Sequence, residues 1–274
     1  MPDQHTVFFV SDRTGITAEM LGNSLLSQFE GLKFRRQTIP FVDTPEKIAD
    51  VVRRIDETAS AEGRRPLVFS SIVDEAMSAQ LSHGNALFLD LFQVFIAPLE
   101  SELHAKSSHA AGRSHGIANS HEYFARMEAI NFTHAHDDGA TTRDLAKAQV
   151  ILIGVSRCGK TPTALYLALQ FGILAANFPL TPDDFTDKKL PSSIEPFREK
   201  LFGLTIDPER LQQIREARRP GSKYAALANC QYEVRQAELL MQRERVTTLD
   251  TTSRSIEEIA TTVLHRAGLQ RNIF

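Results

Sequence analysis

The stretch that decides the fold is residues 148–171, "AQVILIGVSRCGKTPTALYLALQF". The apolar, β-branched residues at the start of this stretch predict a buried strand over 149–154. The residues at its end, "PTALYLALQF", predict a helix over 160–171. Between them, two glycines, a lysine and a threonine have the spacing Gly-x-x-x-x-Gly-Lys-Thr, which is typical of a phosphate-binding loop. The strand–loop–helix context favours a nucleotide-phosphate site over a glycine-rich turn with a surface lysine.

This spacing suits a phosphate for physical reasons. Backbone N–H groups of a tight loop can surround phosphate oxygens, and glycine permits the dihedral angles and the close approach that this requires. The start of the next helix adds free N–H groups and a partial positive charge. We expect Lys160 to reach the outer phosphates and Thr161 to bind Mg²⁺ through its hydroxyl. The predicted nucleotide-binding residues are Gly154, Val155, Ser156, Arg157, Cys158, Gly159, Lys160 and Thr161, with Thr161 also the metal ligand.

Composition limits the class of protein. The chain has 274 residues, 42% hydrophobic and 24% charged, which is typical of one large or two smaller globular domains. A net charge of −3 gives no bulk support for a nucleic-acid partner. Its two cysteines, Cys158 and Cys230, are too few for a disulfide framework or a cysteine zinc site. The start does not resemble a signal peptide and no apolar run could span a bilayer, so we expect a cytoplasmic protein without a membrane partner.

Strand and helix patterns alternate along the chain, which predicts an α/β fold with parallel sheets. The predicted strands are 6–10, 35–42, 66–72, 149–154, 173–178, 202–206 and 246–250. The predicted helices are 16–29, 44–59, 73–82, 160–171, 208–218, 222–242 and 254–267. Residues 85–103 contain a strand and a helix whose division the pattern leaves open. The first helix has Ile16, Met20, Leu21, Leu25 and Phe29 at helical spacing.

These patterns predict two domains and a connector. An N-terminal parallel-sheet α/β domain occupies 1–103, and a P-loop kinase-like nucleotide-binding α/β domain occupies 146–274. The connector, 104–145, is rich in histidine and is expected to contain a helix near 120–130. Its six histidines are His104, His109, His115, His121, His134 and His136. Their irregular spacing disfavours a metal site, although those near 134–136 remain candidates for proton transfer.

A polar cluster, "HDDG" (136–139), precedes the strand of the phosphate-loop motif. Phosphoryl transfer requires groups that position the acceptor and hold magnesium. Asp137 or Asp138 could accept a proton or bind the metal, and both are predicted catalytic residues together with Lys160. The alternative is an Asp-Asp-Gly turn that caps a helix.

Two further groups of residues could meet an anion. In "SDRTG" (11–15), Ser11, Thr14 and the start of the next helix could hold a second phosphate, and the alternative is that Thr14 caps that helix. The second group lies at the end of a predicted helix and could close over phosphates or form a solvated helix end. Its members are Arg215, Arg218 and Arg219. Cys158 is interpreted as a small loop residue and not as a nucleophile.

Several segments together resemble one protein family. They are "GVSRCGKT" with its flanks, "VSDRTGITAEMLG", "PLVFSSIV", "RSHG", "HDDG" and "LFGLTIDPERL". Along almost its whole length the chain resembles the phosphoenolpyruvate synthase regulatory proteins, whose wider family includes the pyruvate, phosphate dikinase regulatory proteins. "GVSRCGKT" is similar to the motif of the synthase-regulating branch.

The resemblance implies a bifunctional enzyme. Members inactivate their target by phosphorylating a threonine with ADP as donor, when the catalytic histidine of the target already carries phosphate. They reactivate it by phosphorolysis, in which inorganic phosphate attacks and pyrophosphate leaves. Transferred to this sequence, residues 154–161 would hold ADP, with Lys160 on the transferred phosphoryl group and Mg²⁺ at Thr161. Asp137 or Asp138 would orient the target hydroxyl, phosphoenolpyruvate synthase would be the partner, and a homodimer is plausible for the family. Arg13 receives no role, because many relatives differ there.

Other functions stay open from sequence alone. The target could be pyruvate, phosphate dikinase, or the chain could be an ATP-dependent P-loop kinase for a small molecule, which would not need the N-terminal domain. A GTPase-like switch is disfavoured because the chain lacks an Asn-Lys-x-Asp motif. Eukaryotic protein-kinase motifs such as "HRD" and "DFG" are also absent from the sequence.

Overall fold

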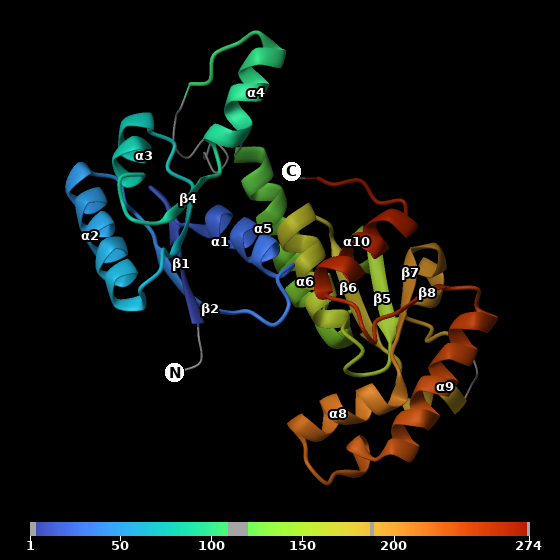
Figure 1. Ribbon diagram of the computed structural model, residues 1–274. Coiled ribbons are helices and arrows are strands. Elements are labelled where there is room, and N and C mark those ends of the chain that lie inside the picture. Colours follow the sequence, from blue (N-terminus) through green and yellow to red (C-terminus); the bar gives the residue numbers. More distant parts are fainter. Residues whose placement is uncertain (1–3, 109–119, 187–188, 273–274) are drawn as a thin grey trace. The chain divides into compact units, whose positions relative to one another are not determined.

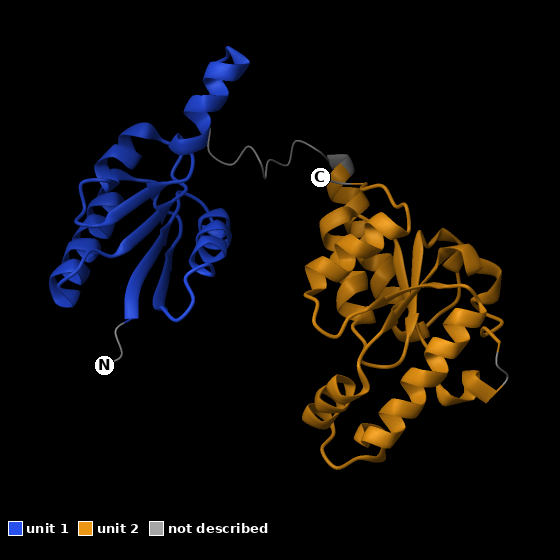
Figure 2. Ribbon diagram, turned by 45° about the vertical axis from the view of Figure 1, so that its right-hand side comes forward, with its two compact units in different colours: residues 1–116 blue, residues 117–274 orange. Residues whose placement is uncertain are grey.

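The computed structural model describes residues 4–108, 120–186 and 189–272 (Figure 1). The chain forms two compact units, Met1–Gly116 and Ile117–Phe274 (Figure 2). Each unit contains a four-stranded, wholly parallel sheet with helices packed against it. The predicted α/β class with parallel sheets is therefore confirmed. The boundary between the units falls inside residues 104–145, and the helix expected near 120–130 belongs to the second unit.

The first unit alternates strands and helices. Its elements are β1 (Gln4–Val10), α1 (Ile16–Leu26), β2 (Lys33–Ile39), α2 (Pro45–Glu62), β3 (Leu67–Ser70), α3 (Glu75–Leu81), β4 (Leu87–Asp90) and α4 (Gln93–Leu103). The strand order is β2-β1-β3-β4. Because side chains alternate along a strand, β1 sends Phe8 and Val10 to a cluster with α2, and Val7 and Phe9 to a cluster with α1. The undivided stretch 85–103 resolves into β4 and α4.

Helix α1 packs through a face that its apolar pattern did not indicate. Its buried positions are Ala18, Gly22 and Leu26. A Cβ atom on Gly22 would lie 2.4 Å from a ring carbon of Phe9, so only glycine permits this close approach of helix and sheet. The predicted apolar positions are exposed at Ile16, Met20, Leu25 and Phe29. Helical spacing therefore identified the helix, but small residues determine its buried face.

The start of α1 also differs from one of the two readings of "SDRTG". The N-cap residue is Gly15, with φ 81° and no side-chain cap, so capping by Thr14 is wrong. Its left-handed conformation is one that glycine adopts at little cost. The first N–H groups of this helix consequently have no side-chain oxygen as a cap.

The second unit contains the phosphate-loop motif. Its helices and strands are α5 (Ser120–Ala135), β5 (Val150–Gly154), α6 (Lys160–Phe171), β6 (Ala175–Pro179), α7 (Pro182–Thr186), β7 (Leu201–Thr205), α8 (Pro208–Arg218), α9 (Leu227–Arg243), β8 (Thr247–Asp250) and α10 (Ile256–Arg266). Short 3-10 turns include η2 (Asp137–Gly139), η3 (Leu145–Lys147), η4 (Glu195–Lys200) and η5 (Lys223–Ala225). The helix predicted over 222–242 begins only at Leu227, because η5 precedes it.

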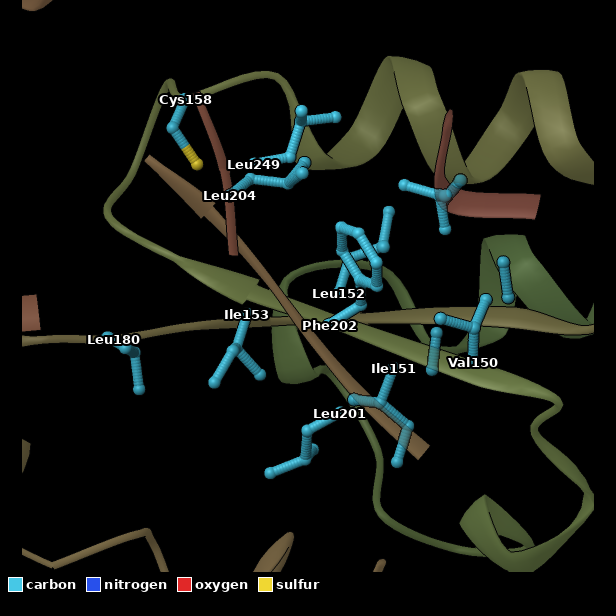
Figure 3. Close-up of a cluster of buried hydrophobic side chains, with 14 of the residues drawn as sticks. Val150, Ile151, Leu152, Ile153, Cys158, Leu180, Leu201, Phe202, Leu204 and Leu249 are labelled. Carbon is cyan, nitrogen blue, oxygen red and sulfur yellow. The ribbon is translucent and has the colours of Figure 1, made fainter. Parts of the chain in front are cut away.

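Strand β5 lies at the centre of the second core and is buried along its whole length (Figure 3). Ile151 and Ile153 point to one face of the sheet and Leu152 to the other, as Figure 3 shows. Helix α6 packs beside α5 and α10, whereas α9 packs against β7. An all-apolar strand is expected where helices cover both faces of a parallel sheet.

The strand order β6-β5-β7-β8 places the motif where α/β proteins bind ligands. The second strand along the chain lies on one side of β5 and the third strand on the other. The sheet therefore reverses its direction of growth at β5, and the loop after β5 lies at the resulting topological switch point. Among the described helices, none combines the length and the apolar character needed to cross a membrane.

Candidate active site

Residues 154–161 form a tight loop from β5 into α6, which we call the 154–161 loop. Gly154 has φ 149°, and a Cβ atom there would lie 2.2 Å from the carbonyl oxygen of Leu204. Gly159 has φ 97° and is the N-cap of α6, without a side-chain cap. Both motif glycines therefore occupy conformations that other residues adopt only with strain. The loop places the uncapped start of α6 at the carboxyl end of β5, where its free N–H groups favour binding of an anion.

Lys160 is enclosed by its own loop. Its side chain is buried, and its Nζ donates a hydrogen bond to the carbonyl oxygen of Val155 at 2.9 Å. Among the described residues, no carboxylate forms an ion pair with this ammonium group. A buried cation without a paired carboxylate is a favourable partner for a bound phosphate.

Three segments meet at the hydroxyl of Thr161. That hydroxyl donates to Oδ1 of Asp137 at 2.8 Å, which brings η2 against the first turn of α6. Asn177, a buried residue of β6, donates from Nδ2 to the same carboxylate and to Thr161 Oγ1. Its Oδ1 accepts from the backbone N–H of Asp138 at 3.0 Å, which fixes the orientation of the amide. The structure thus joins Asp137 to the 154–161 loop.

The two adjacent aspartates have different surroundings. Asp137 is half-buried in the hydrogen-bonded cluster just described, whereas Asp138 is exposed and has φ 48°. The alternative in which this segment merely caps a helix does not account for the contact with Thr161. Burial therefore separates the residues: the Asp137 carboxylate accepts a hydrogen bond from Thr161, whereas Asp138 is exposed to solvent.

The oxygens of this cluster fit a magnesium ion. Mg²⁺ prefers oxygen ligands and is commonly held by one or two carboxylates together with waters and substrate phosphates. The Asp137 carboxylate and the Thr161 hydroxyl offer two oxygens of this kind, 2.8 Å apart. Among the residues that the structure describes, no group of three His, Cys, Asp or Glu side chains is placed to hold a metal ion.

His136 has a structural environment. Its Nδ1 lies 2.8 Å from the carbonyl oxygen of Phe132 and its Nε2 lies 2.7 Å from that of Arg143. The ring stacks on Phe132 and is buried. Both ring nitrogens are therefore engaged with backbone, and the ring anchors the segment that carries Asp137. His134 and His104 are exposed, while His109, His115 and the side chain of His121 lie outside the described residues.

Cys158 is a buried residue of the 154–161 loop and contributes to the packing of the second core. Its side chain is buried, and burial raises the pKa of the thiol above its ordinary value. Because the thiolate is the reactive form, this cysteine is poorly suited to act as a nucleophile. Its carbonyl oxygen accepts a hydrogen bond from Thr251 Oγ1 at 3.0 Å, which ties the loop to the residue after β8.

The three arginines at the end of α8 lie in two different environments. Arg215 is fully buried and paired with Glu233, whereas Arg218 and Arg219 are exposed. For Arg215 the solvated-end interpretation is wrong, because the side chain turns inward between α8 and α9.

"SDRTG" lies at the carboxyl end of β1, the switch point of the first sheet. Ser11 Oγ accepts from the backbone N–H of Arg13 at 3.1 Å, and Asp12 Oδ2 accepts from that of Val73 at 3.3 Å. Ser11 and Asp12 are both buried. These hydrogen bonds give the segment a defined local structure within its own unit.

Sequence reasoning missed three residues that support the site, two by direct hydrogen bonds to it and Glu233 through Arg215. They are Asn177, Tyr224 and Glu233. Only Asn177 carried a usable signal, since it is the one polar residue in the otherwise apolar predicted strand 173–178. A buried amide in such a strand needs hydrogen-bond partners, and functional clusters provide them.

Comparison with known proteins gives two findings. Residues 7–264 match the family described as "Kinase/pyrophosphorylase". A protein of Burkholderia mallei (strain SAVP1) is 57% identical over 269 residues, which cover 98% of this chain and 99% of that protein. A protein of Burkholderia pseudomallei (strain K96243) has the same identity and coverage. Both carry the name "Putative phosphoenolpyruvate synthase regulatory protein".

Proposed function

The chain belongs to the kinase/pyrophosphorylase family, and from that premise we propose that it is a cytoplasmic, bifunctional regulator of phosphoenolpyruvate synthase. It phosphorylates a threonine of the synthase with ADP as donor and removes that phosphate with inorganic phosphate as co-substrate. The observation that carries the proposal is the 154–161 loop, whose buried Lys160 and Thr161–Asp137 contact lie within the region that matches the family.

In the kinase direction, the chain's residues position a diphosphate and an acceptor. The threonine oxygen attacks the β-phosphorus of ADP, the bond from that phosphorus to the bridging oxygen breaks, and AMP leaves. Lys160 neutralises charge on the transferred group. Asp138 is exposed and takes the proton of the hydroxyl of the target threonine. Asp137 is less suited to this role because its carboxylate already accepts a hydrogen bond from Thr161. Mg²⁺, when bound by Thr161 and Asp137, supplies charge neutralisation across the phosphates.

In the opposite direction, an oxygen of inorganic phosphate attacks the phosphorus of phosphothreonine. The bond from phosphorus to the threonine oxygen breaks, that oxygen regains a proton, and pyrophosphate leaves. ADP and pyrophosphate share a diphosphate group. One loop with one lysine therefore suits both the donor of the first reaction and the product of the second.

The test is one incubation of the full chain. Synthase that has been pre-charged with phosphoenolpyruvate is mixed with the protein and ADP labelled at the β-phosphate. We expect label on a threonine of the synthase and loss of its activity, and neither effect with Lys160→Ala. Lys47→Ala is the control, because Lys47 is exposed and lies in the other unit. Added phosphate should restore activity and release pyrophosphate.

Two other outcomes would redirect the proposal. Label on pyruvate, phosphate dikinase in a parallel incubation, with none on the synthase, would change the target and keep the chemistry. No label from ADP on either protein, together with turnover of ATP on a small molecule, would contradict the proposal in favour of a metabolite kinase.

A further inference from the structure

Arg215 has the largest fully buried side chain among the described residues, and this side chain contacts the 154–161 loop at Ser156. A buried guanidinium requires compensation, because removing a charge from water costs free energy unless it is paired. Its Nη2 forms an ion pair with Oε2 of Glu233 at 2.6 Å, and this carboxylate is itself only 9% exposed. The pair joins α8 to α9.

The same guanidinium also holds the loop. Nη2 donates to the carbonyl oxygen of Ser156 at 3.1 Å, and Nη1 donates to that of Tyr224 at 3.1 Å. The guanidinium carbon lies 4.1 Å from the centre of the Tyr224 ring, and the Tyr224 hydroxyl lies 2.9 Å from Ser156 Oγ. Ser156 is therefore held through both its backbone and its side chain by groups from α8 and η5.

This contact fixes the direction of one peptide group. In a planar trans peptide the carbonyl and the N–H point in opposite directions. Because the Ser156 carbonyl points to Arg215, the N–H of Arg157 points away from it, on the other side of the loop chain. Arg157 has φ 77°, a left-handed conformation that persists in a non-glycine residue only where neighbouring groups enforce it.

We propose that Arg215 is a positioning residue for the 154–161 loop. With Glu233 and Tyr224 it holds the Ser156–Arg157 peptide in the orientation that presents the Arg157 N–H to a diphosphate. The charge of Arg215 is matched by Glu233, so its effect on the ligand passes through loop geometry and not through direct contact. The identity of the ligand rests on the proposed function, whereas the effect on the loop does not.

The test uses the full chain with Arg215→Lys, which retains the charge but loses the forked donor geometry. Arg210→Lys is the matched control, because Arg210 lies on the same helix and is exposed. Dissociation constants for ADP and pyrophosphate are measured by calorimetry. Amide hydrogen exchange of the loop is followed without ligand, and urea unfolding reports stability.

We expect Arg215→Lys to weaken binding of both ligands by about tenfold or more, since small misplacements of positioning groups have effects of this size. Amide exchange of the loop should accelerate while that of the buried strand β5 stays unchanged. Tyr224→Phe should shift both readouts in the same direction by a smaller factor. Arg210→Lys should leave binding within twofold of wild type.

A lower urea midpoint with unchanged dissociation constants and unchanged loop exchange would overturn the inference, because Arg215 would then support only the fold. If wild type binds neither ADP nor pyrophosphate, the proposed function fails, and loop exchange in unliganded protein still decides the role of Arg215. Should Arg215→Lys not fold, Glu233→Gln takes its place, because it removes the charge that pairs with Arg215 and nearly keeps the shape of the side chain. Unchanged loop exchange and binding in that variant would overturn the inference.

Discussion

Thr161 is the residue whose hydroxyl joins the 154–161 loop to Asp137, and its substitution separates a metal role from a packing role. We expect Thr161→Val, which keeps the shape, to abolish the difference between ADP binding with Mg²⁺ and ADP binding with a chelator. The reason is that the variant lacks one of the two oxygen ligands of the proposed ion. Calorimetric titration of ADP under the two conditions measures this directly.

Thr161→Ser is the matched control, because it restores the hydroxyl without the methyl group. It should keep the magnesium dependence of ADP binding to within about threefold of wild type, because serine still offers a hydroxyl oxygen to the ion. Magnesium dependence that survives in Thr161→Val would contradict the assignment of this hydroxyl as a ligand.

Gly154 is a second residue at which the structure makes a sharp prediction. A methyl group there would lie 2.2 Å from a backbone oxygen of β7, in addition to the strain of φ 149°. We expect Gly154→Ala to lower the free energy of unfolding by about 2–4 kcal/mol. Gly221→Ala, with φ 67° and nothing within 4 Å, should cost only about 1 kcal/mol. Equal effects in urea unfolding would contradict the predicted clash.

The sequence predicted the loop but not all of its neighbours. Glycine and lysine at fixed spacing satisfy backbone requirements that are local, so they leave a readable pattern. Asn177 and Tyr224 reach the site from segments 16 and 68 residues away from their partners, so local spacing carries no sign of them. Asp137 and Asp138 are sequence neighbours of identical type, and only their burial and hydrogen bonds in the fold distinguish them.

Helix α8 is the element that presents Arg215, and its start is fixed by one side chain. Oδ1 of Asp207 accepts hydrogen bonds from the backbone N–H groups of Glu209 and Arg210, at 2.9 and 3.0 Å. We expect Asp207→Ala to lower the free energy of unfolding by about 1 kcal/mol, the usual cost of losing an N-cap. Asp207→Asn should be close to wild type, because asparagine caps equally well. Urea unfolding of the two variants measures the difference, and equal midpoints would show that the cap contributes nothing.

Elements as a whole were easier to predict than their packing. The periodicity of apolar residues distinguishes strands from helices within short stretches of sequence. Every predicted strand and helix therefore has a counterpart within the described residues. The buried face of α1 was not predictable from its large apolar residues, because Gly22 allows the contact with Phe9. The start of α9 shifted for a similar local reason, since Ser222 caps η5 first.

At the scale of the whole molecule, each unit has its own core and its own complete sheet. The sequence predicted two α/β regions because no strand is predicted between residue 103 and residue 149. It assigned residues 104–145 to a connector because their composition is polar. Helix α5 nevertheless packs on α6, with Phe132 in the second core, since a few apolar residues at helical spacing suffice for docking.

All residues of the candidate active site lie in the second unit. We therefore expect residues 117–274 to fold alone, with a cooperative urea transition, and to bind ADP within about threefold of the full chain, as a domain with its own core should. The comparison fragment is 146–274, which begins after the predicted connector and lacks α5 and Asp137. It should unfold at lower urea and bind ADP more weakly, because α6 loses one of its two neighbouring helices and the Thr161 hydroxyl loses the Asp137 carboxylate. Equal stability and affinity of the two fragments would contradict this assignment of α5 and Asp137 to the second unit and its proposed ADP site.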